Sequence, residues 1–268
     1  MVQTSLKSAC YFEGIGIHSG KQVLLKCLPA EPNTGIVFIR TDLRNQSILV
    51  SPEHVVPSSR YTSLREGSIE IRTPEHVLAA CSGLGISNLR IEINAEEVPI
   101  LDGSALLFVT EFQRVGLQTF SEVLSPLVIT TPIVVQSGDA SVIALPSDRP
   151  QFSYVLSYPQ SFIGSQIVTT YLENFAHDIA PARTYGFYAE VQALLARGLA
   201  QGGGIENAVI IGEDGYLSEL RFPDELARHK LLDLMGDLWI LGRPIVGHVI
   251  GVKSGHALNA TMVQQLHL

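Results

Sequence analysis

The order of predicted elements along the 268-residue chain favours an α+β fold built from two similar halves. Strand-like segments come first in each half and the main helices follow, whereas a doubly wound parallel sheet would alternate strands and helices regularly. Hydrophobic residues make up 46% of the chain and charged residues only 16%, so a large core can form and disorder is excluded. We therefore expect each half to hold several strands and two main helices.

The first half begins with short runs rich in β-branched and aromatic residues, which predict strands. These runs are SLKSACYF (5–12), QVLLKCL (22–28), GIVFIR (35–40) and SIEIR (68–72). A helix should begin at residues 73–75, where Thr, Pro and Glu supply a capping residue, a first-turn proline and a first-turn acid. It should end near Gly83 or Gly85. A strand over 88–93 and a second helix opened by Ser104 complete this half.

The same pattern begins again after about residue 124, so we place one domain at 1–124 and a second at 125–268. The strands predicted there are PIVVQ (132–136), ASVIALP (140–146), FSYVLSY (152–158) and QIVTTYL (166–172). Helices over 188–198 and 223–242 and a final strand and helix follow. The segments EHVLAA and RHKLLD each place a histidine at a helix start, which supports two related halves.

Composition excludes several classes of function. Lys and Arg number 18 against 26 Asp and Glu, and the net charge of −8 argues against a protein that coats nucleic acid or anionic membrane. No apolar run approaches the roughly 18–20 residues of a membrane span, and no secretory signal is visible. Cys10, Cys27 and Cys81 lie far apart without a CxxC pair, as is typical of reduced thiols. We expect a cytoplasmic protein.

Two glycine-rich segments invite a phosphate-loop interpretation, which their spacing excludes. In GIGIHSGK, neither Gly14 nor Gly16 is separated from Gly20 by the four residues that a phosphate loop requires, and Gln22 replaces the necessary Ser or Thr. Residues 202–204 precede a strand instead of opening a helix, so they indicate a turn. No HExxH or GxSxG motif occurs, so serine-hydrolase and standard zincin chemistry are unsupported.

The helix predicted over 223–242 carries the strongest functional signal. His229, Asp233 and Asp237 are spaced i, i+4 and i+8 and form a stripe on one face. A solvated polar face is the ordinary interpretation, but the helix is apolar nearly all round and should be buried. A buried carboxylate must pair with a partner or bind a metal, because an isolated buried charge is costly. His229 and Asp233 could therefore both reach one ion.

The third ligand has its best candidate in the other half, at Glu75-His76. Both residues lie in the first turn of an otherwise apolar helix, where neither serves the core. His76 could complete a His-His-Asp zinc site with one position open for water, and Glu75 could take a proton from that water. Alternatively, His76 is a satisfied semi-buried histidine and Glu75 a partner of the helix dipole.

A further candidate is His256, in the segment KSGH between the last strand and the last helix. A histidine preceded by glycine at such a loop suits a general acid, and Asp237 could hold its ring and keep it protonated. An ordinary strand-to-helix turn is the alternative.

With these residues in view, the sequence resembles the bacterial UDP-3-O-acyl-N-acetylglucosamine deacetylases, zinc amidases that commit the pathway to lipid A. The matching motifs follow the family order over almost the whole chain: GIGIHSGK, SSRYTSL, TPEHVLAA, LDGSA, ARTYGF, GGGIENAVII, HKLLDLMGDL and KSGHALN. The resemblance implies a cytosolic enzyme with two α+β domains, each packing a sheet against two helices and carrying a small insert.

The resemblance also implies roles for individual residues. One Zn²⁺ per chain would be held by His76, His229 and Asp233, with Glu75 as general base. His256 would stabilise the oxyanion and protonate the amine, oriented by Asp237, and Thr184 would help to polarise the amide carbonyl. The implied reaction hydrolyses the acetamide of the UDP-linked acyl sugar and releases acetate.

The resemblance also implies substrate contacts. Lys230 matches a substrate-contacting lysine, and residues 187–212 match an insert that forms an acyl passage. Tyr185 stands where many members have Phe. Lys230, Lys253 and His18 are candidates for contacts to the diphosphate, with an ordinary surface charge as the alternative for each, and Thr62 and Phe187 are further expected substrate contacts.

Two alternatives remain open at this stage. The chain could be a zinc-binding regulatory module that kept the fold but lost turnover, although Glu75 and His256 are not needed merely to hold zinc. It could also be an amidase for a different N-acetyl sugar. In every case we expect a small-molecule partner, no nucleic acid and a monomer.

Overall fold

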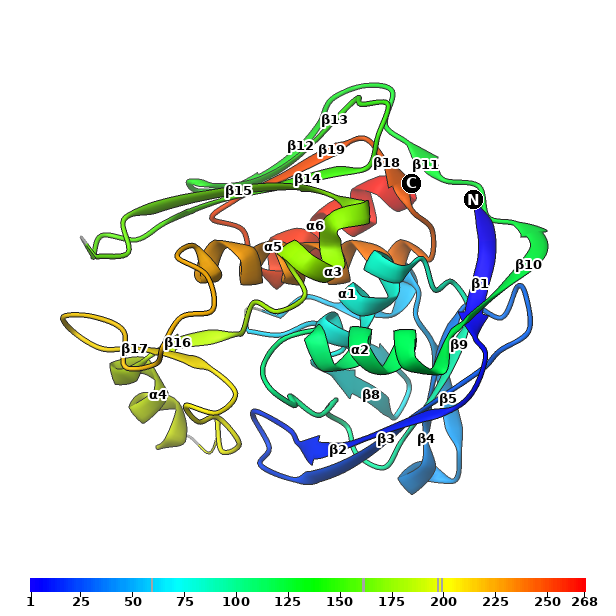
Figure 1. The fold of residues 1–268 in the computed structure, drawn as a ribbon, viewed down its shortest axis with the longest axis horizontal. Coiled ribbons are helices and arrows are strands. Elements are labelled where there is room, and N and C mark those ends of the chain that lie inside the picture. Colours follow the sequence, from blue (N-terminus) through cyan, green and yellow to red (C-terminus); the bar gives the residue numbers. More distant parts are fainter. Residues whose placement is uncertain (59, 161, 197, 199) are drawn as a thin grey trace.

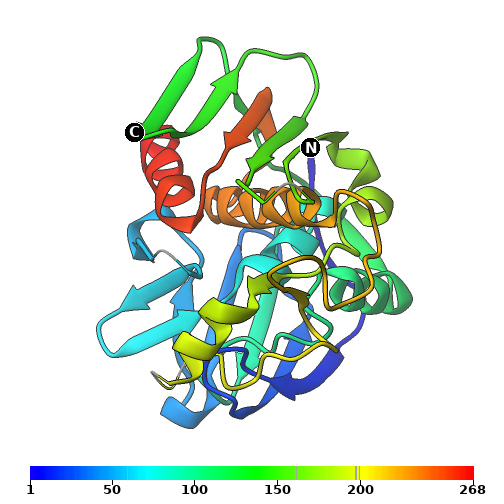
Figure 2. The same ribbon diagram turned by 90° about the vertical axis from the view of Figure 1, so that its left-hand side faces the viewer.

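The computed structural model describes residues 1–268 except 59, 161, 197 and 199. Two five-stranded sheets form the outer layers of the molecule, and the main helices pack between them (Figure 1). Seen from the side, the N-terminal sheet lies below, the C-terminal sheet above, and α5 (Glu225–Leu238) crosses between them (Figure 2). The expected α+β class is confirmed.

The N-terminal sheet is antiparallel except for one central pair. Its strands, in spatial order, are β2 (Cys10–Ile15), β3 (Gln22–Leu28), β9 (Leu89–Ile93), β4 (Ile36–Arg40) and β5 (Gln46–Leu49). Only β4 and β9 run parallel. Along β3 the inward side chains of Val23, Leu25 and Cys27 are buried, which is the period-two pattern of a sheet with one face on the core. Helices α1 (Glu75–Leu84) and α2 (Leu106–Val115) cover that inner face.

The run predicted as one strand over 5–12 is divided between two sheets. Its start belongs to β1 (Val2–Leu6), which pairs with β10 (Leu117–Val123), and its end belongs to β2. The sequence did not indicate β10, because this strand is mostly exposed and its partner lies at the other end of the half. The ladder between β1 and β10 joins the start of the N-terminal half to its end.

A three-stranded sheet forms the insert of the N-terminal half. It consists of β6 (Val55–Val56), β7 (Ser63–Glu66) and β8 (Ile69–Arg72), all antiparallel. The predicted run over 68–72 therefore belongs to this insert and not to the main sheet. Single 3₁₀ turns at Thr41–Leu43 and Pro52–His54 lie on the way to it.

The C-terminal sheet repeats the arrangement of the N-terminal one. Its strands, in spatial order, are β12 (Ile133–Ser137), β13 (Ala140–Leu145), β19 (His248–Val252), β14 (Gln151–Ser157) and β15 (Ser165–Tyr171). Again only one pair, β14 and β19, runs parallel. The boundary expected at 124/125 falls between β10 and β11 (Leu127–Val128), which pairs with β18 (Ile245–Val246).

The insert of the C-terminal half holds two short parallel strands and a helix. These are β16 (Tyr185–Phe187), α4 (Tyr188–Leu195) and β17 (Val209–Ile211). The short helix α3 (Phe175–Asp178), preceded by a 3₁₀ turn at Leu172–Asn174, leads into this insert. The helix expected over 188–198 is α4, and residues 197 and 199 of the expected insert lie outside the described residues.

The helix predicted over 223–242 is α5, continued by a 3₁₀ turn at Trp239–Leu241 and ended by Gly242 in the left-handed region. Every residue from Leu231 to Ile240 is buried, as its all-round apolar character predicts. The final helix, α6 (His256–His267), follows β19. None of the helices in the described part of the chain is both long and apolar enough to cross a membrane.

Helices α1 and α5 approach each other very closely at Gly236. A Cβ added there would lie 2.1 Å from the carbonyl oxygen of Glu75, so only glycine fits this crossing.

The start of α1 differs from the expectation that Thr73 caps the helix. Thr73 does not cap the helix, since Pro74 occupies the cap position without a side-chain bond and Thr73 has a φ of 57°.

Candidate active site

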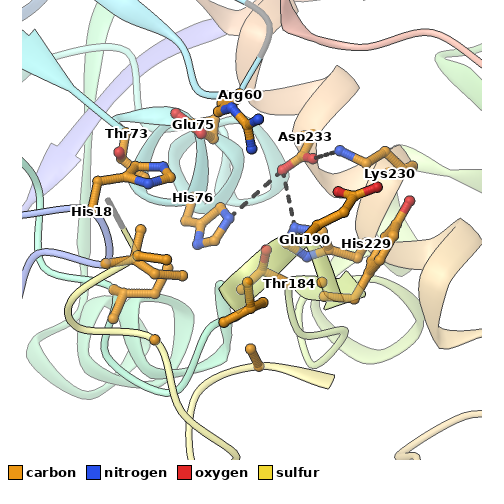
Figure 3. Close-up of a pocket in the computed structure, with 18 of the residues that line it drawn as sticks. His18, Arg60, Thr73, Glu75, His76, Thr184, Glu190, His229, Lys230 and Asp233 are labelled. Carbon is orange, nitrogen blue, oxygen red and sulfur yellow. Dashed lines mark hydrogen bonds and ion pairs between the residues drawn. The ribbon is translucent and has the colours of Figure 1, made fainter. Parts of the chain in front are cut away.

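Three buried side chains from the two halves converge beside this crossing. His76 lies in the first turn of α1, while His229 and Asp233 lie one turn apart on α5 (Figure 3). The Oδ1 atom of Asp233 is 3.6 Å from Nε2 of His76 and 3.3 Å from Nε2 of His229. One ligand atom from each of the three lies within 4.8 Å of the others. The expected ligand set is therefore brought together.

The protonation of these groups suits a metal ion. The Nδ1–H of His229 donates to the carbonyl oxygen of Ala182 at 3.1 Å, which turns its Nε2 toward the other ligands. Burial lowers the pKa of His229 to about 3, so its ring is neutral. Burial opposes ionisation of Asp233, but the charged ammonium of Lys230, which donates to this carboxylate, helps to hold its pKa well below the usual value. Neutral imidazoles and a carboxylate are the forms that bind metals.

The hydrogen bonds of Asp233 leave one oxygen for an ion. Its Oδ2 accepts from Nζ of Lys230 at 2.6 Å, whereas its Oδ1 is buried and has no hydrogen-bond partner among the described residues. A buried carboxylate oxygen without a donor is costly unless a cation faces it. Two imidazole nitrogens and one carboxylate oxygen fit zinc, which favours such mixed donors in tetrahedral sites with an open position.

Glu75 lies next to this cluster and is 3% exposed. Its Oε1 is 3.8 Å from Nε2 of His256, and its Oε2 accepts from the backbone N–H of Thr62 at 3.3 Å. Burial raises the pKa of Glu75 to about 7, although the neighbouring His256 and His76 act in the opposite direction. A carboxylate with such a pKa can accept a proton from water near neutral pH.

His256 begins α6 and points toward the same cluster. Its Nδ1 lies 3.0 Å from Oδ2 of Asp237, which also accepts from Nδ2 of Asn259 at 2.8 Å. Burial lowers the pKa of His256, but Asp237 and Glu75 outweigh it and raise that pKa to about 9. The ring is therefore protonated at neutral pH and can act as an acid, with its orientation fixed by Asp237.

A cavity of about 300 Å³ opens onto these groups. Titratable groups, among them Glu75, His76, Asp233 and His256, line one side of it. The other side is largely apolar and comes from both halves, and its lining residues are Ile17, Ile100, Val191, Ala200, Ala208 and Ile210. The cavity therefore joins a polar reacting centre to an apolar surface.

Comparison with known proteins identifies the family. The model of the UDP-3-O-acyl N-acetylglycosamine deacetylase family matches residues 3–267. The UDP-3-O-acyl-N-acetylglucosamine deacetylase of Leptospira biflexa is 43% identical over 97% of this chain and 88% of the relative. The relatives of the same name from Chlamydia felis (41% identical, 98% and 96% covered) and Citrifermentans bemidjiense (40%, 98% and 88%) agree. The chain belongs to this deacetylase family. It is thus a hydrolase that acts on an amide.

The expected substrate residues of this deacetylase divide into two groups. His18, Thr184, Tyr185 and Lys230 line the cavity, as Figure 3 shows for the three that it labels. The Tyr185 hydroxyl lies 3.0 Å from that of Tyr158, a contact that a phenylalanine at this position would lack.

The other three expected contacts are placed elsewhere. Lys253 pairs with the exposed Asp139, Nζ to Oδ2 at 2.7 Å, outside the cavity. Phe187 packs edge-on against the Tyr158 ring, with centroids 5.1 Å apart, and is not among the lining residues. Thr62 is buried behind the cavity wall, where its hydroxyl faces Asp237 and His256.

Sequence reasoning missed several residues at the cavity. Arg60 and Glu190, both exposed, line it from the two inserts, and Glu97 accepts the backbone N–H groups of His18 and Ser19 at 2.8 and 2.9 Å. The glycines of GIGIHSGK and of residues 202–204 are the sequence signal that could have indicated a close backbone contact between these two loops. A Cβ on Gly202 would lie 2.4 Å from the carbonyl oxygen of Gly16, so the two glycine-rich loops meet across the halves.

Proposed function

We propose that this chain hydrolyses the acetamide of UDP-3-O-acyl-N-acetylglucosamine, with one Zn²⁺ held by His76, His229 and Asp233. The products are acetate and the free amine of the UDP-linked 3-O-acyl glucosamine, the committed step of lipid A biosynthesis. Family membership supports the substrate. The observation that carries the mechanism is the convergence of three metal-binding side chains from two helices beside Glu75 and His256.

Zinc at this position supplies Lewis acidity, which lowers the pKa of water and polarises a carbonyl group. Glu75 removes a proton from the attacking water, and its pKa of about 7 keeps much of it ionised near neutral pH. His256 and Glu75 are 3.8 Å apart, so acid and base face the same reacting centre. As the amide bond breaks, protonated His256 gives its Nε2 proton to the leaving amine.

Thr184 supports the charge that develops on the acetyl oxygen. It lines the cavity, and its backbone N–H donates to the carbonyl oxygen of Gly103 at 2.7 Å, which fixes the start of β16. With the backbone held in this way, the Thr184 hydroxyl is a fixed hydrogen-bond donor, and a fixed donor stabilises a developing oxyanion without reorganising during the reaction. Asp237 serves the same step by orienting His256.

The remaining cavity residues bind the substrate. Lys230 and His18 are placed for the polar part of the nucleotide sugar, while Tyr185 and the apolar lining suit the acyl chain. The insert over 187–212 contributes much of that lining. We propose a monomer, since the proposed site needs no residue from a second copy, and three free buried cysteines support a reducing, cytoplasmic location.

The decisive experiment replaces the base without changing its shape. Glu75→Gln should retain bound zinc, measured by elemental analysis, while acetate release from the acylated UDP sugar falls by about two orders of magnitude or more. Glu111→Gln, on the outer helix α2, is the matched control and should keep normal turnover. Near-normal turnover of Glu75→Gln would remove Glu75 from the mechanism.

Two further measurements test the alternatives. A regulatory module would bind zinc and release no acetate from the unaltered chain. An amidase for another sugar would act as well on UDP-N-acetylglucosamine, which lacks the acyl chain, as on the acylated sugar. We expect a strong preference for the acylated sugar, because the apolar lining binds only that group.

A further inference from the structure

Thr62 lies at the meeting point of the acid and the base. It precedes β7 in the insert of the N-terminal half and is 4% exposed. Its hydroxyl bonds to Oδ1 of Asp237, a residue 175 positions further along the chain, and lies 3.2 Å from Nδ1 of His256. Its backbone N–H donates to Oε2 of Glu75 at 3.3 Å. One residue therefore contacts all three groups.

The hydrogen bonds around Asp237 show which partner the Thr62 hydroxyl donates to. Asp237 uses Oδ2 for the Nδ1–H of His256 and the amide of Asn259, so Oδ1 is left to Thr62 among the described residues. A hydroxyl has one proton to donate, and this proton goes to the carboxylate. Its lone pairs then face the Nδ1–H of His256. Thr62 thus fixes both the carboxylate and the ring that the carboxylate orients.

The backbone of Thr62 is also held in place. The N–H of Thr73, two residues before Glu75, donates to the Thr62 carbonyl oxygen at 3.0 Å. The start of α1 and the start of β7 are therefore joined twice, through Thr73 and through the side chain of Glu75. A shift of the insert would move the base and the acid together.

We propose that Thr62 is a positioning residue that couples the general base to the general acid. Its backbone holds Glu75 and its hydroxyl holds the Asp237–His256 pair, so the insert of the N-terminal half takes part in the reaction. This inference rests on the proposed roles of Glu75 and His256. It replaces the substrate contact expected for Thr62, because Thr62 is not among the residues that line the cavity and its hydroxyl is engaged by Asp237 and His256.

The test compares Thr62→Val, which keeps the shape and removes the hydroxyl, with Thr62→Ser, which keeps the hydroxyl. Thr62→Val should lower kcat by roughly 10- to 100-fold, as expected for a lost hydrogen bond to a buried charged group, with KM within about twofold and zinc fully retained. Thr62→Ser should recover most of kcat. Thr170→Val, a buried threonine on β15 remote from the cavity, is the matched control and should keep normal turnover.

A combined variant separates positioning from a general loss of structure. If Thr62 acts through His256, adding Thr62→Val to His256→Ala should lower kcat by less than about threefold further. The full 10- to 100-fold loss in that background would overturn the inference. Zinc loss in Thr62→Val and Thr62→Ser alike would also overturn it, since the role would then be structural.

The same series distinguishes this inference from the proposed function. If Glu75→Gln and His256→Ala both keep normal turnover, the proposed function fails, and this inference fails with it. If both lose turnover while Thr62→Val is normal, the proposed function stands and only the role of Thr62 is wrong.

Discussion

The two halves of the molecule share one topology but divide the chemistry unequally. In each five-stranded sheet the strand that comes last in the chain, β9 or β19, is central and runs parallel to one neighbour. In each half one helix, α1 or α5, precedes this central strand and a second helix, α2 or α6, follows it. The insert also occupies the same place in both halves, between the fourth strand of the sheet and the first main helix.

The first helices differ in how they meet the site. α1 offers two functional residues, Glu75 and His76, in its first turn, whereas α5 offers His229 and Asp233 along its buried length. The rings of His76 and His229 meet edge-on, with centroids 5.1 Å apart and planes at 90°. The repeated arrangement therefore places the start of α1 against the middle and end of α5, and the candidate site forms where the two helices touch.

The second helices differ still more. α6 begins with His256, while α2 begins with Leu106, whose N–H donates to the hydroxyl oxygen of Ser104 at 3.1 Å. Only the C-terminal half therefore places a histidine, the proposed acid, at this position. A shared fold constrained the position of each helix start, while the residue at that position was free to diverge.

The largest expected effect tests whether both halves supply ligands. His76→Ala and His229→Ala each remove one of three metal donors, so each should weaken zinc affinity by roughly three orders of magnitude and abolish acetate release. Competition with a chelator measures the affinity. His177→Ala, which replaces an exposed histidine of α3, serves as control and should bind zinc normally. If either variant keeps zinc and turnover, the replaced histidine is not a ligand.

A second substitution tests the contact between the two halves and leaves the expected metal ligands unchanged. Gly236→Ala places a methyl group 2.1 Å from the carbonyl oxygen of Glu75, so α1 and α5 must move apart. We expect the free energy of unfolding to fall by about 2–4 kcal/mol, with reduced zinc affinity, because His76 moves with α1. Gly215→Ala has no atom within 4 Å of its new methyl group and should be neutral. Equal stability of the two variants in urea would show that the crossing tolerates a wider separation.

The smallest expected effect concerns the insert of the N-terminal half. Burial opposes ionisation of Glu70, but hydrogen bonds from Arg72, Arg65 and Ser63 lower its pKa to about 2. A lowered pKa stabilises the folded state above the usual value near 4.5, and this contribution is lost as the pH falls from about 4.5 to 2. Glu70→Gln should therefore lose roughly 1–2 kcal/mol at pH 7 and much less near pH 2, measured by urea unfolding.

The control for this prediction lies in the C-terminal half. Glu173 pairs with Arg149 at the surface, where solvent screens the charges, so Glu173→Gln should change stability little at either pH. A Glu70→Gln variant whose stability deficit does not shrink in acid would show that the carboxylate of Glu70 contributes no pH-dependent stability.

Much of the site could be predicted because its key spacings are local. His229 and Asp233 share a face because four residues make about one helical turn, and the surrounding leucines predict that this face is buried. The start of α1 at Glu75 follows from Pro74 and a first-turn acid, even though Thr73 does not cap the helix. His76 and His256 were candidates from their places at a helix start and in a glycine-containing turn, and the family motifs gave them their expected roles.

The remaining features depend on contacts between residues far apart in the chain. The exposed β10 gave no burial pattern and forms only because β1 lies beside it. Lys253 was expected at the substrate, yet the turn after β19 directs it toward Asp139. Arg60 and Glu190 reach the cavity only because the two inserts fold over it.

The sequence by itself therefore determined the fold class and the buried helix α5, and it singled out the candidate metal-binding and acid–base residues, since these follow from helix periodicity, helix-start signals and family motifs. Only the tertiary structure decided that Gly236 brings α1 against α5 and that Thr62 links Glu75 to Asp237 and His256. The physical reason is that helix geometry relates residues within a few positions, whereas packing of the whole chain joins residues 175 positions apart.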